Sequence, residues 1–433
     1  MGIKRLSGAH VPHHKNTTHC APVRIPIPAK VRIPMSMHIG APCTPTVKVG
    51  DAVKVGQPIG EAGGFVSAPI HSSVSGKVTA IEDLLMNNGS TSKAVVIETD
   101  GEQTVWEGVQ PPVIEDSTSF VAAIRASGLV GLGGAGFPAS VKLSVKDPTQ
   151  VEYLLINGAE CEPYITSDVQ TMLCDTDYVL KGAALIRKYV GAKHIILGIE
   201  DNKPEAIKLF QERAHEVEDF TVAAMPSLYP QGGEKVLIYN TTGRIVPEGK
   251  LPLDVGCIVM NVTSLAFVAK YVETGMPLVE KCLTVDGSAV ANPQNVIAPI
   301  GTSIHDIIEA CGGYKATPKK ILYGGPMMGM AVPNDEIPMV KNNNAILAFA
   351  EAEAKLPPTT ACINCGRCID ACPLNLMPNH IARAYNNRDA AALGRLKVML
   401  CMECGCCSFV CPARRELVLT NKLAKTFLRE QPK

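Results

Sequence analysis

The sequence is poor in aromatic residues, in net charge and in long apolar runs. Phe, Trp and Tyr make up 5% of its 433 residues, and 41 basic residues balance 41 acidic ones. No basic run is interleaved with aromatic residues, which argues against a nucleic-acid partner. No apolar run approaches the roughly 18 residues of a membrane-spanning helix, and residues 1–14 lack the apolar core of a signal peptide. We therefore expect a soluble or peripheral protein.

The hydrophobic and glycine content of the sequence fits a folded α/β protein. Hydrophobic residues make up 46% of the chain, and there are 37 glycines. At about 100–200 residues per domain, the length allows two to four domains. Of the 16 cysteines, eight fall in two ordered runs and the others are scattered singly. This pattern indicates a protein of a reducing, cytosolic compartment rather than a disulfide scaffold.

Two cysteine runs near the C-terminus share the pattern C-x2-C-x2-C-x3-C-P. This pattern holds cubane iron–sulfur clusters in bacterial two-cluster ferredoxins, where the fourth cysteine of each run binds the other cluster. The sequence therefore predicts two 4Fe-4S clusters with crossed ligands. One cluster takes Cys362, Cys365, Cys368 and Cys411, and the second takes Cys401, Cys404, Cys407 and Cys372.

Zinc sites and disulfides are the alternatives for these runs. Zinc knuckles also use C-x2-C, but a four-coordinate site leaves no role for the repeated fourth cysteine with its trailing proline. Cys406 falls out of register and is predicted to be a bystander.

The first 115 residues predict short β segments separated by turns. Residues 47–59 and 67–78 resemble the two halves of a lipoyl or biotinyl carrier, a β-sandwich hybrid that flanks a modified lysine. The hairpin tip at residues 62–66 contains no lysine, so we expect the scaffold without the swinging-arm function. The histidines at the start of the chain lack a fixed ligand spacing, which favours a solvated tail over a metal site.

A glycine-rich loop at residues 131–138 leads into a predicted helix that carries Lys142. Dense glycine lets the backbone approach a ligand closely, and amides at a helix N-terminus suit a phosphate. Glycine loops also occur as plain tight turns, so the spacing alone leaves both interpretations open.

Four buried-type strands, at residues 151–156, 193–199, 220–224 and 257–260, alternate with helices and predict a βαβ sheet. Polar clusters follow three of them, at the edge where open α/β sheets bind ligands. Each polar residue alone could merely be solvated, but their coincidence at successive strand ends favours a site. They are Asn157, Glu160 and Glu162, then Tyr229 to Glu234, then Asn261 and Ser264.

Taken in order, these motifs resemble the flavin- and NADH-binding subunit of respiratory complex I. With a carrier-like domain in front and two cluster motifs behind, the whole chain resembles the C subunits of the Rnf complexes, ion-translocating ferredoxin:NAD oxidoreductases. The resemblance implies non-covalent FMN held by Gly131, Gly133, Gly134, Gly136, Lys142, Asn157, Glu160, Tyr229, Gly232, Gly233, Glu234, Asn261 and Ser264. It also implies that Phe137, Glu162 and Glu234 lie on the nicotinamide side of NADH. Leu132 and Ala159 depart from complex I, which has arginine and aspartate there.

The predicted fold class is a multidomain α/β protein. We expect a barrel-sandwich hybrid without a carrier lysine at residues 1–115 and a Rossmann-like FMN- and NADH-binding domain at 116–275. A small β-grasp module at 276–332 and a linker at 333–358 follow, before a helical ferredoxin-type two-cluster domain at 359–433.

The function that follows is electron transfer. FMN takes a hydride from NADH, whereas each cluster accepts one electron, so the flavin is the converter between them. No side chain need act as nucleophile or general base. The resemblance implies a peripheral subunit at the cytoplasmic face of the cell membrane, with integral membrane subunits and a ferredoxin-like subunit as partners. Two alternatives remain: a stand-alone flavin and iron–sulfur reductase serving a cobalamin enzyme or an amino-acid reductase, and a non-redox scaffold with structural clusters.

Overall fold

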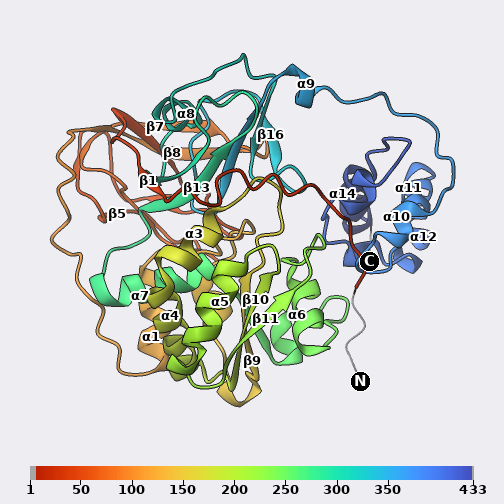
Figure 1. The fold of residues 1–433 in the computed structure, drawn as a ribbon. Coiled ribbons are helices and arrows are strands. Elements are labelled where there is room, and N and C mark those ends of the chain that lie inside the picture. Colours follow the sequence, from red (N-terminus) through yellow and green to blue (C-terminus); the bar gives the residue numbers. More distant parts are fainter. Residues whose placement is uncertain (1–5, 432–433) are drawn as a thin grey trace.

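The computed structural model describes residues 6–431; residues 1–5 and 432–433, at the ends of the first and last predicted domains, lie outside it. The chain forms a β-rich part, an α/β part beside it and a helical lobe at one side (Figure 1). Within residues 6–431, no helix combines the length and the apolar character needed to cross a membrane.

The N-terminal β-rich part contains two antiparallel sheets whose inner residues are fully buried. Ile59, Ile70, Val78 and Ile97 are each 0% exposed. The first sheet has the order β2 (Lys30–Pro34), β8 (Thr91–Thr99), β7 (Gly76–Leu85), β4 (Ala52–Val53). The second has the order β3 (Thr44–Pro45), β5 (Pro58–Glu61), β6 (Ile70–His71). The predicted hairpin tip lies between β5 and β6.

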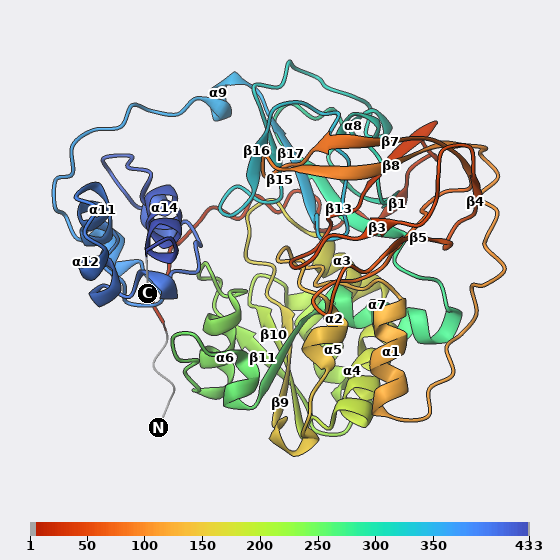
Figure 2. The same cartoon turned by 180° about the vertical axis from the view of Figure 1, so that it is seen from behind.

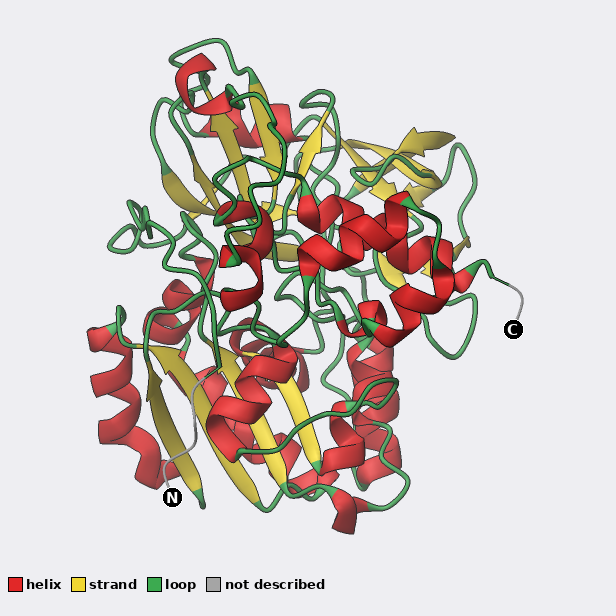
Figure 3. Ribbon diagram, turned by 90° about the vertical axis from the view of Figure 1, so that its right-hand side faces the viewer, coloured by secondary structure: helices red, strands yellow, loops and turns green. Residues whose placement is uncertain are grey.

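The four predicted strands of the α/β part form one parallel sheet, seen between helices in Figure 3. Its order is β11 (Phe220–Met225), β10 (His194–Glu200), β9 (Tyr153–Gly158), β12 (Cys257–Asn261). Alternate residues of β9 pack on opposite faces: Leu154 joins the main core, and Leu155 packs with Leu237 and Ile238. Both faces of the sheet are therefore buried, which explains its nearly continuous apolar strands.

Seven α-helices belong to this part, and the first has a side-chain cap. Asp116 accepts a hydrogen bond from the Ser119 backbone N–H and caps α1. The helices are α1 (Ser117–Ala126), α2 (Ala139–Leu143), α3 (Ser167–Cys174), α4 (Thr176–Val190), α5 (Pro204–Arg213), α6 (Glu234–Thr242) and α7 (Val262–Thr274).

A six-stranded sheet follows, and it corrects the prediction of a linker at residues 333–358. Its order is β1 (Val23–Arg24), β14 (Gln294–Pro299), β13 (Glu280–Asp286), β17 (Ala345–Phe349), β15 (Lys320–Tyr323), β16 (Met330–Val332). Strand β17 comes from the predicted linker, yet all five of its residues are buried. It pairs with β13 on one side and β15 on the other, so it is a central strand of the sheet. Its five consecutive apolar residues fit a strand that is buried on both faces. Helix α8 (Ile304–Ala310) lies in this part and is capped by Ser303.

The exposed connection is shorter than predicted. After α9 (Glu351–Ala354), residues 355–365 are all exposed and run alongside the molecule to the helical lobe (Figures 1 and 2). The lobe contains α10 (Arg367–Asp370), α11 (Pro378–Asn386), α12 (Ala390–Arg395), α13 (Cys406–Phe409) and α14 (Leu417–Arg429).

Candidate cofactor sites

Two cavities in the helical lobe are each lined by one predicted set of cluster ligands. The fourth cysteine of each run faces the cavity of the other run, so the structure brings the crossed sets together. One cavity is lined by Cys362, Cys365, Cys368 and Cys411. The second is lined by Cys372, Cys401, Cys404 and Cys407.

The cysteines surround a volume rather than a point, as a cubane with one cysteine at each iron requires. Within residues 6–431, no group of three or more His, Cys, Asp or Glu side chains converges on a position for a single metal ion. Cys406 also lines the second cavity, but its thiol lies 3.6 Å from the backbone oxygen of Tyr229 and has that oxygen as its partner.

The glycine loop is closed by its own backbone. The Gly131 N–H donates to the Phe137 carbonyl over 2.8 Å, and the Gly136 N–H donates back to the Gly131 carbonyl over 3.2 Å. The buried Lys281 ammonium donates to the Leu132 carbonyl over 2.9 Å, and burial lowers the pKa of this lysine to about 8. A lysine from the six-stranded sheet thus fixes a loop about 150 residues earlier in the chain.

The loop lies over the N-terminus of α7. Asn261 caps this helix by accepting from the N–H groups of Thr263 and Ser264, and the Ser264 hydroxyl accepts from the Leu132 N–H over 2.9 Å. A Cβ on Gly133 would stand 3.1 Å from Asn261 Nδ2, so the backbone approaches the cap closely. Two predicted residues, Asn261 and Ser264, therefore support the loop from below.

Residues 133–135 of the loop have backbone N–H groups that suit a phosphate group. Among the described residues, the N–H groups of Gly133, Gly134 and Ala135 donate to no protein acceptor. A Cβ on Gly134 would meet no heavy atom within 4 Å, and one on Gly131 would stand 3.7 Å from its nearest neighbour. Backbone amides without a protein acceptor, in a loop beside a helix N-terminus, are what a phosphate requires.

Other predicted residues gather at the same edge of the parallel sheet. Lys142 Nζ donates to the Val259 carbonyl over 2.8 Å and lies 3.5 Å from Glu234 Oε2. Asn157 Nδ2 donates to the Gly232 carbonyl over 2.8 Å. Lys142 thus joins β12 to the start of α6, and Asn157 joins the end of β9 to the turn before α6.

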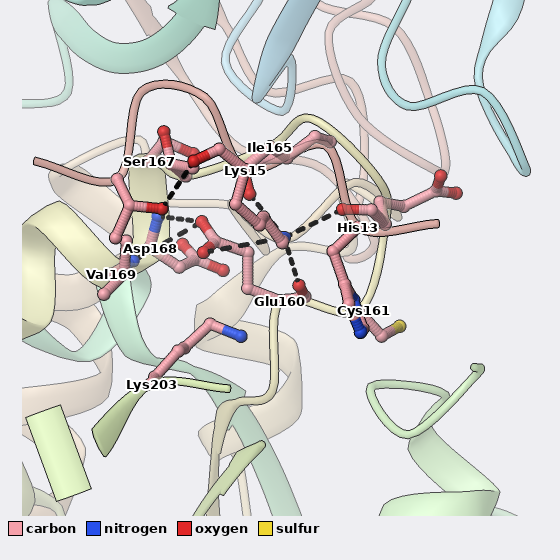
Figure 4. Close-up of polar contacts among 12 residues, drawn as sticks. His13, Lys15, Glu160, Cys161, Ile165, Ser167, Asp168, Val169 and Lys203 are labelled. Carbon is pink, nitrogen blue, oxygen red and sulfur yellow. Dashed lines mark hydrogen bonds and ion pairs between the residues drawn. The ribbon is translucent and has the colours of Figure 1, made fainter. Parts of the chain in front are cut away.

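Glu160 faces a lysine that the sequence reasoning missed (Figure 4). Lys15 Nζ lies 4.0 Å from Glu160 Oε2 and donates to the backbone carbonyls of Glu160, Glu162 and Ile165 over 2.7, 2.9 and 2.6 Å. Burial lowers the pKa of Lys15 to about 8 and raises that of Glu160 to about 7, while their mutual attraction opposes both shifts. The histidines of this segment, His10, His13, His14 and His19, are exposed, as a solvated segment predicts. The segment is not a free tail, however, because Lys15 satisfies three carbonyls of a buried turn.

The Glu160 carboxylate is satisfied on one side only. Oε1 accepts from the Asp168 N–H over 2.6 Å, whereas Oε2 is buried without a hydrogen-bond partner among the described residues. Nearby, Lys203 donates to the carbonyl of Ala159 over 2.7 Å. A buried, half-satisfied carboxylate at a strand end is typical of a ligand site.

Glu162 makes a different contact from the predicted one with NADH. Its Oε2 accepts from the Met327 N–H over 3.0 Å and its Oε1 from the Met328 N–H over 2.8 Å. Burial raises the pKa of Glu162 to about 7, and these two N–H groups oppose the shift. The nicotinamide role of Glu162 stays a prediction.

The cysteine lobe packs on the turn at the end of β11. The Tyr229 hydroxyl donates to the Cys404 carbonyl over 2.7 Å. Met402 fills the space over Gly233, where a Cβ would stand only 2.1 Å from its terminal methyl carbon. The second cysteine cavity therefore adjoins the predicted flavin edge.

No local signal marks the residues that the sequence reasoning missed. Lys15, Asp168 and Lys281 belong to no recognisable motif, and only the long-range fold reveals that they face the loop and its strand-end neighbours. Asp168 accepts from Asn261 Nδ2 over 2.7 Å.

A flavin-type α/β sheet joined to a two-cluster lobe defines a class of electron-transfer proteins. Four family models match in chain order: the RnfC barrel sandwich hybrid domain at residues 4–102, the Nuo51 FMN-binding domain at 124–270, the SLBB domain at 283–331 and the 4Fe-4S dicluster domain at 357–412. FMN and iron–sulfur clusters are accordingly its cofactors.

The chain belongs to the family of C subunits of ion-translocating oxidoreductase complexes. It is 42% identical to the C subunit of the Na(+)-translocating ferredoxin:NAD(+) oxidoreductase complex of Acetobacterium woodii, covering 88% of this chain and 87% of the relative. It is also 42% identical to the proton-translocating counterpart of Clostridium ljungdahlii, covering 87% and 83%. The C subunit of an ion-translocating oxidoreductase complex from Rhodobacter capsulatus is 36% identical, covering 98% and 83%. Among solved structures, an air-oxidised NAD+-reducing [NiFe]-hydrogenase matches at a TM-score of 0.49 and 21% identity, covering 72% of this chain and 53% of that one.

Proposed function

We propose that this chain transfers electrons between NAD(H) and its two iron–sulfur clusters by way of FMN, as a subunit of an ion-translocating ferredoxin:NAD oxidoreductase complex. The observation that carries the proposal is the hydrogen bond from Tyr229 to the Cys404 carbonyl. It joins the turn at the flavin edge directly to a cluster ligand.

FMN would lie with its phosphate on the free amides of Gly133 and Gly134. When bound, FMN supplies the exchange of a two-electron hydride for single electrons. The chain would hold and orient it: Lys142 would contribute positive charge, and Asn261 and Ser264 would support the loop from the N-terminus of α7. Of the remaining predicted contacts, the proposal retains Gly131, Gly136, Phe137, Asn157, Glu160, Tyr229, Gly232, Gly233 and Glu234.

The contact between Tyr229 and Cys404 supports an order for the two clusters. The cluster of Cys401, Cys404, Cys407 and Cys372 would be the proximal one, because its Cys404 contacts Tyr229. The cluster of Cys362, Cys365, Cys368 and Cys411 would be distal. Its Cys362 and Cys365 are exposed, so it is the one placed to meet an external partner.

The organisation that supports this route is a barrel-sandwich hybrid, a Rossmann-like flavin domain, a β-grasp module completed by β17, and a helical two-cluster domain. The partners would be the other subunits of the complex, including integral membrane subunits and a ferredoxin-like subunit. The chain would be peripheral at the cytoplasmic face of the cell membrane.

An anaerobic titration of the purified protein with NADH tests the proposal. We expect about eight irons and one non-covalent FMN per chain, with flavin bleaching followed by cluster reduction. Protein without flavin, or flavin that NADH does not bleach, would contradict it. Co-purification with membrane subunits would separate a member of the complex from a stand-alone reductase.

A further inference from the structure

The loop at residues 324–330, Gly-Gly-Pro-Met-Met-Gly-Met, touches both the flavin edge and the cysteine lobe. On the flavin side, the backbone N–H groups of Met327 and Met328 donate to the two oxygens of Glu162 over 3.0 and 2.8 Å. Gly325 lies close to the same carboxylate, since a Cβ on Gly325 would stand 2.3 Å from Glu162 Oε2. The carboxylate thus fixes the loop by two charge-assisted hydrogen bonds, which are stronger than neutral ones.

On the cluster side, the same loop supports the turn that carries a proximal ligand. The Met327 carbonyl lies 2.8 Å from the position that a Cβ on Gly405 would occupy, and Gly405 has a φ of +84°. The Met327 side chain also packs with Cys404 and Cys406 in one apolar cluster. Only a glycine at position 405 allows this close approach with that backbone conformation.

Glu162 is itself held in place at its backbone. Lys15 donates to the Glu162 carbonyl over 2.9 Å, so the residue is anchored at its main chain while its side chain holds the loop. A continuous set of contacts therefore runs from Lys15 through Glu162 and Met327 to Gly405.

We propose that Glu162 is a positioning residue that holds the loop at residues 324–330 against the Cys404–Gly405 turn, and so sets the separation between the flavin site and the proximal cluster. This rests on the proposed function. Electron transfer slows steeply with distance, so a loosened loop slows flavin-to-cluster transfer while it leaves hydride transfer from NADH to the flavin intact.

Gly325→Ala tests the contact from the loop side, where no cofactor contact is assigned. In stopped-flow mixing of the holoprotein with NADH, we expect flavin bleaching at the wild-type rate. Cluster reduction should be slower by about tenfold, which corresponds to about 1.4 kcal/mol of activation free energy. Met328→Ala is the matched control. It keeps the backbone N–H that Glu162 accepts and removes only an exposed side chain, so both rates should stay unchanged.

Glu162→Ala tests the same contact from the carboxylate side, and Glu162→Gln tests rescue. Alanine leaves two N–H groups without an acceptor, whereas glutamine keeps one acceptor oxygen. We expect cluster reduction to slow in the order wild type, Gln, Ala, and the magnetic interaction between reduced proximal cluster and flavin radical, read by EPR, to weaken in the same order.

The overturning result is specific. Cluster reduction at the wild-type rate in both Gly325→Ala and Glu162→Ala would refute the positioning role. So would a Glu162→Ala protein in which only flavin bleaching slows, since that assigns Glu162 to nicotinamide binding. Failure of NADH to bleach the wild-type flavin would instead contradict the proposed function.

Discussion

The Tyr229 hydroxyl donates to the backbone carbonyl of Cys404 over 2.7 Å, although the two residues are 175 positions apart. This bond joins the end of a parallel strand to a predicted cluster ligand. Because Tyr229 is buried, its hydroxyl needs such a partner, and burial holds its pKa well above the usual value. The hydroxyl therefore acts as a fixed donor, and the two parts of the chain keep one relative position.

Single ligand replacements distinguish the proximal cluster from the distal one. Cys411→Ser should lose or alter the distal cluster while NADH still reduces the flavin and the proximal cluster. Cys372→Ser, although in the first run, should damage the proximal cluster and interrupt transfer to both. Iron content, falling from about eight per chain, and anaerobic EPR spectra measure the effect.

Cys406→Ser is the control for these two variants, because Cys406 is assigned to no cluster. It should retain both EPR signals. The crossed assignment would be wrong if Cys411→Ser removed the signal that depends on Cys401 and Cys404.

A methyl group on the glycine loop should block FMN without disturbing the fold. A Cβ on Gly131 would stand 3.7 Å from the backbone of Phe137, an ordinary contact, and would add bulk inside the loop that is proposed to hold FMN. Overpacking of about 1–3 kcal/mol corresponds to a loss of FMN affinity of roughly tenfold to a hundredfold. Flavin content and FMN titration of Gly131→Ala measure it.

Gly394→Ala makes the same change at an open glycine in α12, far from the loop. It should keep full flavin content, and both variants should keep their iron. Normal FMN affinity in Gly131→Ala would show that FMN does not bind against this part of the loop.

Local sequence patterns predicted the features whose geometry is local. The cysteine spacing, the glycine loop and the apolar strands each occupy a few consecutive residues, so the pattern carries the structure. Strand β17 is the exception. Its apolar run, Ala345–Phe349, is also local, but flanking Asn and Pro residues favoured a linker, and its pairing partners β13 and β15 lie far back in the chain.

The polar supports of the site could not be predicted in this way. Lys15 satisfies carbonyls about 150 residues later, and Lys281 satisfies a carbonyl about 150 residues earlier. These lysines donate to backbone carbonyls that the fold leaves without other partners. Neither the lysines nor the residues that carry the carbonyls form a sequence pattern that predicts the contact. The same holds for the Glu162 carboxylate, whose acceptor role depends on a loop from another part of the chain.

Replacing Lys15 should destabilise the turn at Glu160. Lys15→Met leaves three carbonyls without a donor and Glu160 without its buried partner, so we expect a loss of about 3–5 kcal/mol and weaker flavin retention. Glu160→Gln in the same chain should recover part of this loss, because the two side chains are coupled. Anaerobic thermal unfolding of the two single variants and the double variant measures it.

The exposed Lys48, replaced by methionine, is the control and should change neither flavin retention nor the unfolding midpoint. Strict additivity of Lys15→Met and Glu160→Gln would show that the lysine acts only on the carbonyls and not on the carboxylate.

Lys341 should make the free energy of unfolding depend on pH. It is a fully buried lysine in the stretch predicted as a linker. Its ammonium donates to the carbonyls of Pro69 and Gly128 over 2.7 Å each, and so ties the N-terminal sheet to the segment before the glycine loop. Burial lowers its pKa from 10.5 to about 7. At a pH between these two pKa values, Lys341 is protonated in the unfolded chain and neutral in the folded protein. Its contribution to the free energy of unfolding therefore rises with pH, by up to about 1.4 kcal/mol per pH unit.

Lys341→Met should abolish this contribution. The difference in unfolding free energy, wild type minus variant, should therefore grow as the pH rises from 7 to 9 and level off below pH 7, where both states hold the proton. Thermal unfolding of the holoprotein at several pH values measures it, with the exposed Lys146→Met as the control. Parallel pH profiles for wild type and Lys341→Met would show that Lys341 stays charged in the fold. Its two carbonyl partners would then offset the whole cost of burying the ammonium.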